Sequence, residues 1–241
     1  MSSVLQDFVA SPYTLGTMSI ASFIIARAII YHVKKIGPIP FAPTVIKYNS
    51  YAYSIFSLFL CMGITASIWD ELSSTSDPSI RSLICSSPFS EFDRQLRFIF
   101  HTSKLYEYVD IFNVLAVGGV VNAHFAIHHF TTMYFTYARV LCYPVGWKIF
   151  GVLNTMHHAI MYAYFGGSAV FSDILPWTGM LQLVAGIVGE IYVIRNVWSG
   201  GDECGSMDSL WANILALGLL STYLVLFAGD LRARWQKEKH E

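Results

Sequence analysis

The sequence predicts an all-α, polytopic membrane protein that forms a single domain over residues 1–241, and three observations carry this prediction. The chain is 54% hydrophobic and only 13% charged, whereas about a quarter of the residues are charged in a typical soluble domain. Apolar segments of roughly 20 residues, the length that crosses a ~30 Å hydrocarbon core, follow one another along almost the whole chain. Ionisable residues stand inside some of these segments, where they are costly unless they face one another, a cavity or a substrate.

Seven segments fit transmembrane helices. Pro38 and Pro40 interrupt the connection after the first segment, and Gly118 and Gly119 allow a tight reversal between the third and the fourth. A cytosolic tail, residues 231–241, follows the last segment. The segments lie near residues 14–33, 46–69, 99–117, 120–141, 146–166, 177–197 and 209–230.

The orientation follows from the basic residues beside the first and last segments. These are Lys34, Lys35, Lys47, Arg232, Arg234, Lys237 and Lys239. With an odd number of spans both groups fall on one side, which is cytosolic because basic loops stay in the cytosol. The N-terminus is then lumenal. Arg139 and Lys148 would also lie on the lumenal side, which runs against the same rule.

The end of the chain suggests a location. Lys237 and Lys239 occupy the fifth and third places from the end and resemble the dilysine signal that returns membrane proteins to the endoplasmic reticulum. The alternative is a basic tail that only stops translocation. The formal net charge of −1, without a long basic run, gives no reason to expect a nucleic-acid partner.

Histidines are concentrated in two of the apolar segments. His124 and His128 share a helix face at a spacing of four, and His129 is rotated about 100° from His128. In the next segment, a helix would place His158 on one face with Met161, Tyr162 and Phe165. Neutral imidazole can bind a metal, transfer a proton or act as a nucleophile. The alternative use is interhelical hydrogen bonding.

Just before the first histidine cluster, Lys104, Glu107 and Asp110 advance by three residues and therefore fall on one helical stripe. This Lys-x-x-Glu-x-x-Asp stripe, the histidine box and the later His158-x-x-Met161-Tyr162-x-Tyr164 run resemble the ELO family of very-long-chain fatty acid elongases. The chain departs from the family pattern in its box, where three residues instead of two follow His124.

The resemblance implies an acyltransferase of the endoplasmic reticulum membrane, a very-long-chain 3-oxoacyl-CoA synthase whose helices mostly enclose an acyl tunnel. Such an enzyme condenses acyl-CoA with malonyl-CoA to 3-ketoacyl-CoA and releases CO₂ and CoA, without a metal or a cofactor. It implies His128 as the nucleophile, with His129, His124 and His158 as base, orienting group or oxyanion partner. The substrate-binding candidates are Lys104, Glu107, Asp110, Asn154, Met161, Tyr162 and Gln182.

Candidate partners are acyl-CoA, malonyl-CoA, the lipid bilayer, the other enzymes of the elongation cycle and a second copy of the chain. The basic residues at the cytosolic side could attract the phosphates of CoA. Leu183, Gly186, Val193 and Tyr223 are expected on the tunnel wall from helical register.

Two other classes of protein remain open. A membrane di-iron desaturase or hydroxylase also carries histidine boxes, but it needs roughly eight imidazoles. This chain has eight in total, of which His32 and His240 lie outside the clusters and His101 is isolated. A seven-span receptor or transporter is the second alternative, although its polar groups would be more dispersed.

The four cysteines predict one disulfide. Cys85 and Cys204 lie in connections that the topology places in the lumen, where oxidation is permitted. Cys142 is the competing partner, and Cys61 is expected inside an apolar helix. A Cys85–Cys204 bond would join the second connection to the sixth across the closed end of the tunnel.

Overall fold

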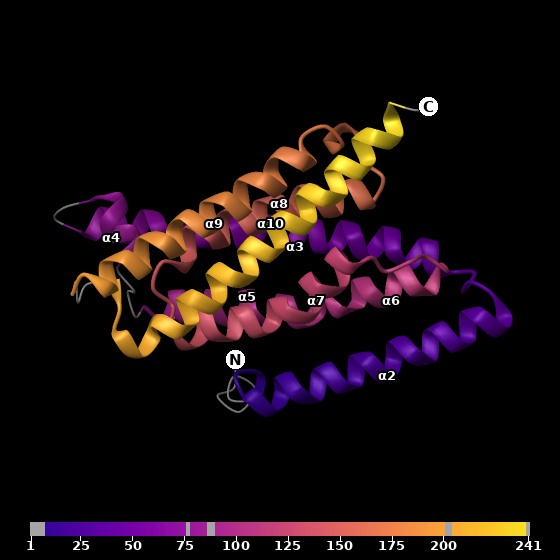
Figure 1. The fold of residues 1–241 in the computed structure, drawn as a ribbon, viewed down its shortest axis with the longest axis horizontal. Coiled ribbons are helices and arrows are strands. Elements are labelled where there is room, and N and C mark those ends of the chain that lie inside the picture. Colours follow the sequence, from indigo (N-terminus) through magenta and orange to yellow (C-terminus); the bar gives the residue numbers. More distant parts are fainter. Residues whose placement is uncertain (1–7, 76–77, 86–89, 201–203, 240–241) are drawn as a thin grey trace.

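The computed structural model describes residues 8–75, 78–85, 90–200 and 204–239, and these residues form helices and connections without any strand. Figure 1 shows long helices lying roughly alongside one another, with shorter helices among them. The α-helices are α2 (Pro12–Ile36), α3 (Ala42–Ser74), α4 (Ile80–Cys85), α5 (Glu91–Tyr106), α6 (Tyr108–Ala116), α7 (Ala123–Thr136), α8 (Trp147–Phe165), α9 (Leu175–Trp198) and α10 (Leu210–Glu238).

The bundle has two distinct ends, which we name the basic end and the disulfide end. At the basic end lie the α2–α3 connection, the C-terminus of α6 and the C-terminus of α10 (Figure 1). The backbone N–H of Ile39 donates to the carbonyl of Ala116 at 2.9 Å, which joins the first connection to α6. At the disulfide end Cys85 and Cys204 are bonded to each other.

Within the described part of the chain, four helical segments are long and apolar enough to cross a membrane: Pro12–Ile36, Ala42–Ser74, Leu175–Trp198 and Met207–Lys237. Apolar side chains are exposed along them, among them Phe23 on α2 and Phe59 on α3. Large exposed apolar surfaces are stable against lipid and not against water. The chain is therefore a multi-pass membrane protein. The helices between α3 and α9 carry most of the buried ionisable groups described below. These groups lower the mean hydropathy of the helices, so hydropathy alone does not establish seven spans.

The first helix stands apart from the site. α2 is capped at its start by Ser11, whose Oγ accepts from the N–H of Tyr13, and it ends at Gly37, whose φ of 109° favours glycine. Its main neighbours are α6 and α7 (Figure 1). Ser19 on α2 bonds Tyr134 on α7 at 2.6 Å, a polar contact of the kind that joins helices in membranes.

The helix expected near 99–117 has other bounds in the structure and is interrupted once. The structure has α5 starting at Glu91, a break at Glu107 and then α6. Glu107 keeps a φ of −60° and a ψ of −11°, so the chain turns there without leaving the helical region. The predicted reversal at Gly118 is present, with a φ of 77° and an N–H that donates to the carbonyl of Leu115 at 3.0 Å.

Other boundaries also shift. The helix predicted at 120–141 is α7 followed by a π-helix, η1 (Tyr137–Cys142), and α10 continues to Glu238, through most of the predicted tail. α4 was not expected. The sequence could not show these changes because apolar periodicity does not distinguish α from π geometry, and the charged end of α10 remains compatible with a helix after the apolar run stops.

The two basic residues that ran against the predicted orientation are both buried in ion pairs. Arg139 Nε donates to Glu190 Oε1 at 2.8 Å, and Lys148 Nζ donates to Glu71 Oε2 at 2.8 Å. The positive-inside rule counts basic residues in loops. A basic residue that is neutralised inside the bundle carries little weight in that rule, which removes the conflict.

Candidate active site

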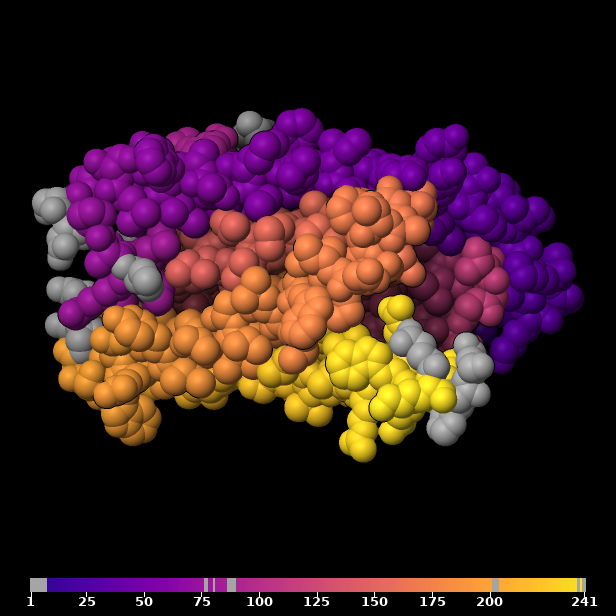
Figure 2. Space-filling view, turned by 90° about the horizontal axis from the view of Figure 1, so that it is seen from above, coloured from indigo at the N-terminus to yellow at the C-terminus, as the bar shows by residue number. Residues whose placement is uncertain are grey.

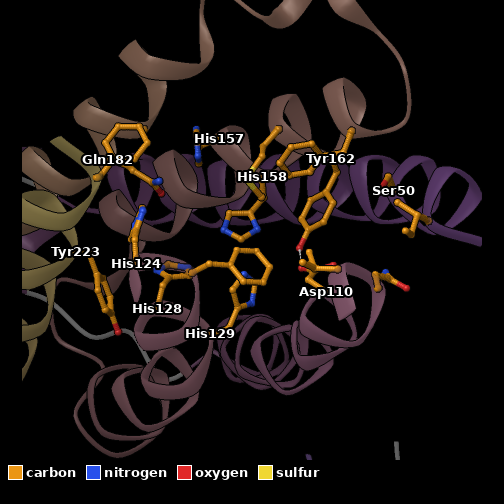
Figure 3. A pocket seen from close by; sticks show the side chains of 18 of the residues that line it. Ser50, Asp110, His124, His128, His129, His157, His158, Tyr162, Gln182 and Tyr223 are labelled. Atoms are coloured by element: carbon orange, nitrogen blue, oxygen red, sulfur yellow. Dashed lines mark hydrogen bonds between the residues drawn. The ribbon is translucent and has the colours of Figure 1, made fainter. Parts of the chain in front are cut away.

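A cavity of about 380 Å³ lies between α3, α6, α7, α8, α9 and α10. Figure 3 shows imidazoles entering it from α7 and α8, with Gln182 and Tyr223 on one side and Asp110 and Ser50 on the other. The predicted residues that line it are His124, His128, His129, His158, Asp110, Met161, Tyr162 and Gln182.

The start of α7 orients its three histidines. Asn122 caps the helix by accepting from the N–H of Phe125 at 2.8 Å. His128 then lies with its ring centroid 4.8 Å from that of Tyr223 and 5.3 Å from that of His129. His124 also lines the cavity, but its Nδ1 bonds Asp230 Oδ2 on α10 at 2.9 Å. The histidine box is therefore split between the cavity floor and the α7–α10 contact.

α8 contributes the opposite wall. His158, Met161, Tyr162 and Phe165 all line the cavity, which is the face that the helical spacing predicts. His157 lines it as well, and its Nδ1 bonds Thr178 Oγ1 on α9 at 2.8 Å. The sequence contains His157 beside His158, but a neighbour rotated by about 100° was not expected on the same cavity.

Lys104 and Glu107 lie behind His158 and do not border the cavity. Lys104 Nζ is 2.6 Å from Glu107 Oε1 and 3.5 Å from His158 Nε2, while His158 Nδ1 is 3.3 Å from Glu107 Oε1. Tyr53 on α3 donates to the same carboxylate oxygen at 3.1 Å. Because all of these groups are buried, they can fix the orientation of the His158 ring and the charge beside it.

The remaining predicted residues act in pairs. Tyr162 donates its hydroxyl hydrogen to Asp110 Oδ2. Asp110 is therefore paired with Tyr162, although the sequence places it on one helical stripe with Lys104 and Glu107. Asn154 lies behind the cavity wall and donates from Nδ2 to Gln182 Oε1 at 2.8 Å. This contact holds the Gln182 amide at the cavity surface, where its Nε2 remains available as a donor.

Three potential ligand groups, from Glu107, His128 and His158, lie within 4.8 Å of one another. Imidazole and carboxylate could together bind a transition metal. The Lys104 ammonium, however, already bonds Glu107 at 2.6 Å and stands beside His158, so a positive charge occupies this position. The donor set therefore fits an ammonium–carboxylate–imidazole cluster better than a metal centre.

A second cavity of about 450 Å³ lies toward the disulfide end. Its wall includes Gly186 and Val193, two of the residues expected on a tunnel wall, while Leu183 and Tyr223 line the first cavity. Phe150 borders the second cavity and packs edge-on against Phe135, with 5.5 Å between the ring centroids.

Other predicted sites lie away from the cavities. Cys85 and Cys204 are disulfide-bonded, and Cys61 and Cys142 are free. Lys237 is in the last turn of α10, and Lys239 follows the helix as its C-cap. His101 is fully buried and bonds Thr136 at 2.9 Å, apart from the other histidines of the site.

Sequence reasoning missed Tyr53 and Asp230. Tyr53 is an aromatic residue in an apolar helix, and Asp230 directly follows the apolar part of α10, so neither carries a local signal of a role at the site. Both reach it only through the packing of helices that are distant in sequence, since the Tyr53–Glu107 contact spans 54 positions and the His124–Asp230 contact spans 106.

The architecture and the site define a class: a helical multi-pass membrane protein with a histidine-lined internal cavity. The model of the ELO (GNS1/SUR4) family matches residues 8–241. The chain belongs to this family. It is also 27% identical over 229 residues to "Putative fatty acid elongase 3" of Caenorhabditis elegans, a match that covers 87% of this chain and 68% of that protein. These findings support a role in fatty acid elongation over the desaturase and receptor alternatives.

Proposed function

We propose that the protein is a 3-oxoacyl-CoA synthase that condenses acyl-CoA with malonyl-CoA. The observation that carries the proposal is the convergence of His128, His129 and His158, from two helices, on one cavity. Family membership supports elongation as the process. Substrates held among these imidazoles would be shielded from bulk water, which a decarboxylating condensation requires.

In the first half-reaction, a neutral nitrogen of His128 attacks the thioester carbonyl carbon of acyl-CoA. The carbon–sulfur bond breaks, CoA leaves as a thiolate, and the acyl group stays on the imidazole. The second ring nitrogen of His128 then loses its proton, and the thiolate takes up a proton to leave as the thiol. His129 lies beside His128 with 5.3 Å between the ring centroids, and it is the candidate proton carrier.

In the second half-reaction, malonyl-CoA loses CO₂ and becomes an enolate. The enolate carbon attacks the acyl carbonyl, and the bond between that carbonyl and His128 breaks. The departing imidazole takes up one proton from water, through His129 as the candidate carrier, and this restores the free imidazole. The developing negative charges need fixed donors. The Gln182 amide, held by Asn154, and the His158 imidazole, beside the Lys104 ammonium, are the groups placed to supply them.

The acyl chain would extend from His128 toward the second cavity, because the basic end is the favourable place for the phosphates of CoA. We further propose seven spans, with α5–α6, α7 and α8 as the three that hydropathy does not identify. The basic end would face the cytosol and the N-terminus the lumen of the endoplasmic reticulum. Lys237 and Lys239 would act as the retrieval signal, and the other elongation enzymes would be partners.

The test is a condensation assay on the purified full-length protein with acyl-CoA and labelled malonyl-CoA. We expect 3-ketoacyl-CoA and labelled CO₂ in equal amounts. His128→Ala should abolish both, while His32→Ala, a change on the exposed face of α2, should abolish neither. If the wild-type protein in lipid releases no CO₂ with any acyl-CoA from medium to very long chains, the proposal is wrong.

A further inference from the structure

The histidine cavity has a second polar end that the reaction chemistry does not use. It is formed by Ser50 in the third turn of α3, and by Asp110 and Asn113 on α6. Figure 3 shows Asp110 at the hydroxyl end of Tyr162 and Ser50 beyond Tyr162, both on the side opposite His124, Gln182 and Tyr223. We name this part of the cavity the Ser50 lobe, after Ser50, Asp110 and Asn113.

We propose that the Ser50 lobe binds the pantetheine arm of the CoA thioesters, through hydrogen bonds to its amides and its hydroxyl group. This inference rests on the proposed function, because pantetheine enters the cavity only as part of a thioester substrate. It assigns a substrate-contacting role to Ser50 and Asn113, which lie outside the family motifs that the sequence displays.

The polar groups of the lobe have unused hydrogen-bonding capacity. In the described part of the chain, neither the Ser50 hydroxyl nor the Asn113 amide makes a hydrogen bond, although Ser50 is only 4% exposed. Asp110 receives the Tyr162 hydroxyl on Oδ2, which leaves Oδ1 as an acceptor. Ser50 is buried, and Asp110 and Asn113 are half-buried at the cavity. Polar groups that face a cavity with free hydrogen-bonding capacity can bind a ligand with matching donors and acceptors.

The apolar lining of the lobe suits the rest of the arm. Ile46, Val114 and Val117 line the cavity beside the three polar residues. Pantetheine alternates amides with short methylene segments and carries a pair of methyl groups next to its hydroxyl. A fatty acyl chain would leave the Ser50 hydroxyl, the Asn113 amide and Asp110 Oδ1 without a hydrogen-bond partner, which is unfavourable in a buried site. The lobe therefore fits pantetheine better than it fits the acyl chain.

Charge indicates the direction in which the arm leaves. Ile46 is in the first turns of α3 and Val117 directly follows α6, so the lobe reaches the basic end. Lys47 is exposed next to Ile46, and Lys34 and Lys35 are exposed at the end of α2. These cations favour the phosphates of CoA. The other approach to the histidines passes Asp230, whose side chain is 47% exposed and whose charge repels phosphate.

Figure 2 shows that this end of the molecule is hollowed, with α6 visible in a recess between the α8–α9 connection and the last turns of α10. Val114 on α6, Val117 just after it and Phe165 at the end of α8 all line the cavity. The recess therefore lies where an arm leaving the lobe would reach the surface.

The test compares three thioesters of one fatty acid: the CoA ester, the pantetheine ester and the N-acetylcysteamine ester. The last keeps the amide nearest sulfur and lacks the second amide and the hydroxyl. The measured quantity is the ratio of kcat/KM for the pantetheine ester to kcat/KM for the N-acetylcysteamine ester. We expect this ratio to fall about five- to tenfold in Ser50→Ala and in Asn113→Leu, the effect of losing one net hydrogen bond.

Matched controls are Ser57→Ala, a buried serine two turns further along α3, and Asn196→Leu, whose amide bonds the Tyr192 carbonyl on α9. Both should keep the wild-type ratio. An unchanged ratio in Ser50→Ala and Asn113→Leu, with turnover retained, would overturn the Ser50 lobe assignment alone. If the wild-type protein turns over none of the three esters, the failure lies with the proposed function. Because each variant is compared with itself on two esters, a partial loss of folded protein cancels from the ratio.

Discussion

Two buried ion pairs, Arg139–Glu190 and Lys104–Glu107, differ in their surroundings. Each nitrogen of Arg139 donates a hydrogen bond, to Glu190 and to the carbonyls of Tyr143 and Val145, and Asn213 donates to the second oxygen of Glu190 at 2.7 Å. The Lys104–Glu107 pair instead contacts His158 at the cavity wall, and Glu107 Oε2 has no hydrogen-bond partner among the residues that the structure describes.

The comparison separates two uses of buried charge. A saturated pair such as Arg139–Glu190 holds η1 to α9 and α10 and offers no group to a substrate. An incompletely satisfied pair beside an imidazole retains the capacity to stabilise charge that develops during a reaction. We therefore infer that the Lys104–Glu107 pair serves the chemistry and that the Arg139–Glu190 pair serves the fold.

The largest expected effect is on catalysis by the pair near the cavity. The double variant Lys104→Met/Glu107→Gln removes both charges and so avoids leaving one buried and unpaired. We expect it to fold and to lose about 10²–10³ in kcat, the usual effect of removing a fixed group that stabilises developing charge. The condensation assay, normalised to folded protein, measures this. A rate near that of the wild type would remove the pair from the chemistry.

The matched change at the other pair should act on stability. Arg139→Met leaves Glu190 buried without its partner and should lower the free energy of unfolding by about 3–5 kcal/mol. Arg139→Met/Glu190→Gln should regain much of this loss and keep the wild-type rate per folded molecule. Unfolding in a denaturing-detergent titration, followed by helical circular dichroism, gives the stabilities. If Arg139→Met/Glu190→Gln loses as much rate as Lys104→Met/Glu107→Gln, the two ion pairs do not differ in their role in the reaction.

The Cys85–Cys204 disulfide extends the comparison, because we expect this bond, like the Arg139–Glu190 pair, to stabilise the fold without taking part in the reaction. Its closed segment spans 119 positions. Removing it with Cys85→Ser/Cys204→Ser should cost about 2–4 kcal/mol, less than chain entropy alone predicts for so long a loop, since membrane insertion already restricts the unfolded chain. Cys142→Ser, at an exposed free thiol, is the control. Peptide mapping without reduction should find the Cys85–Cys204 peptide, and free thiols at both positions would contradict the bond.

The smallest expected effect concerns product length. A Cβ added at Gly186 would lie 2.9 Å from Phe150 and 3.0 Å from Leu220, so Gly186→Ala must displace the Phe150 ring that borders the second cavity. We expect the preferred product to shorten by about one two-carbon unit, because a displaced side chain takes up space of methylene size. Gly218→Ala, where the added atom meets nothing within 4 Å, is the control. Equal product spectra would exclude Phe150 from limiting the chain.

Local patterns predicted the parts of the site that local geometry determines. The spacing of His158, Met161, Tyr162 and Phe165 placed them on one face, and that face lines the cavity. The composition predicted a membrane protein, since apolar segments follow one another along almost the whole chain. The sequence could not predict the helix break at Glu107, because the spacing of Lys104, Glu107 and Asp110 fits an unbroken helix equally well.

What the sequence could not provide are the partners from other helices. His124 was expected with His128 on one face, but its bond to Asp230 depends on how α10 crosses α7. The difference between the two ion pairs is of the same kind. Whether a buried carboxylate is saturated depends on residues such as Asn213 and Tyr53, which only the packed structure brings to it.

The central claim is that His128 carries the acyl group. The most direct measurement is mass spectrometry of the purified protein after incubation with acyl-CoA alone, followed by peptide mapping. The account predicts one acyl adduct per chain on the peptide that contains His128, lost on addition of malonyl-CoA and missing from folded His128→Ala. An acyl adduct of wild-type abundance in His128→Ala, or one mapped to a cysteine, would contradict it.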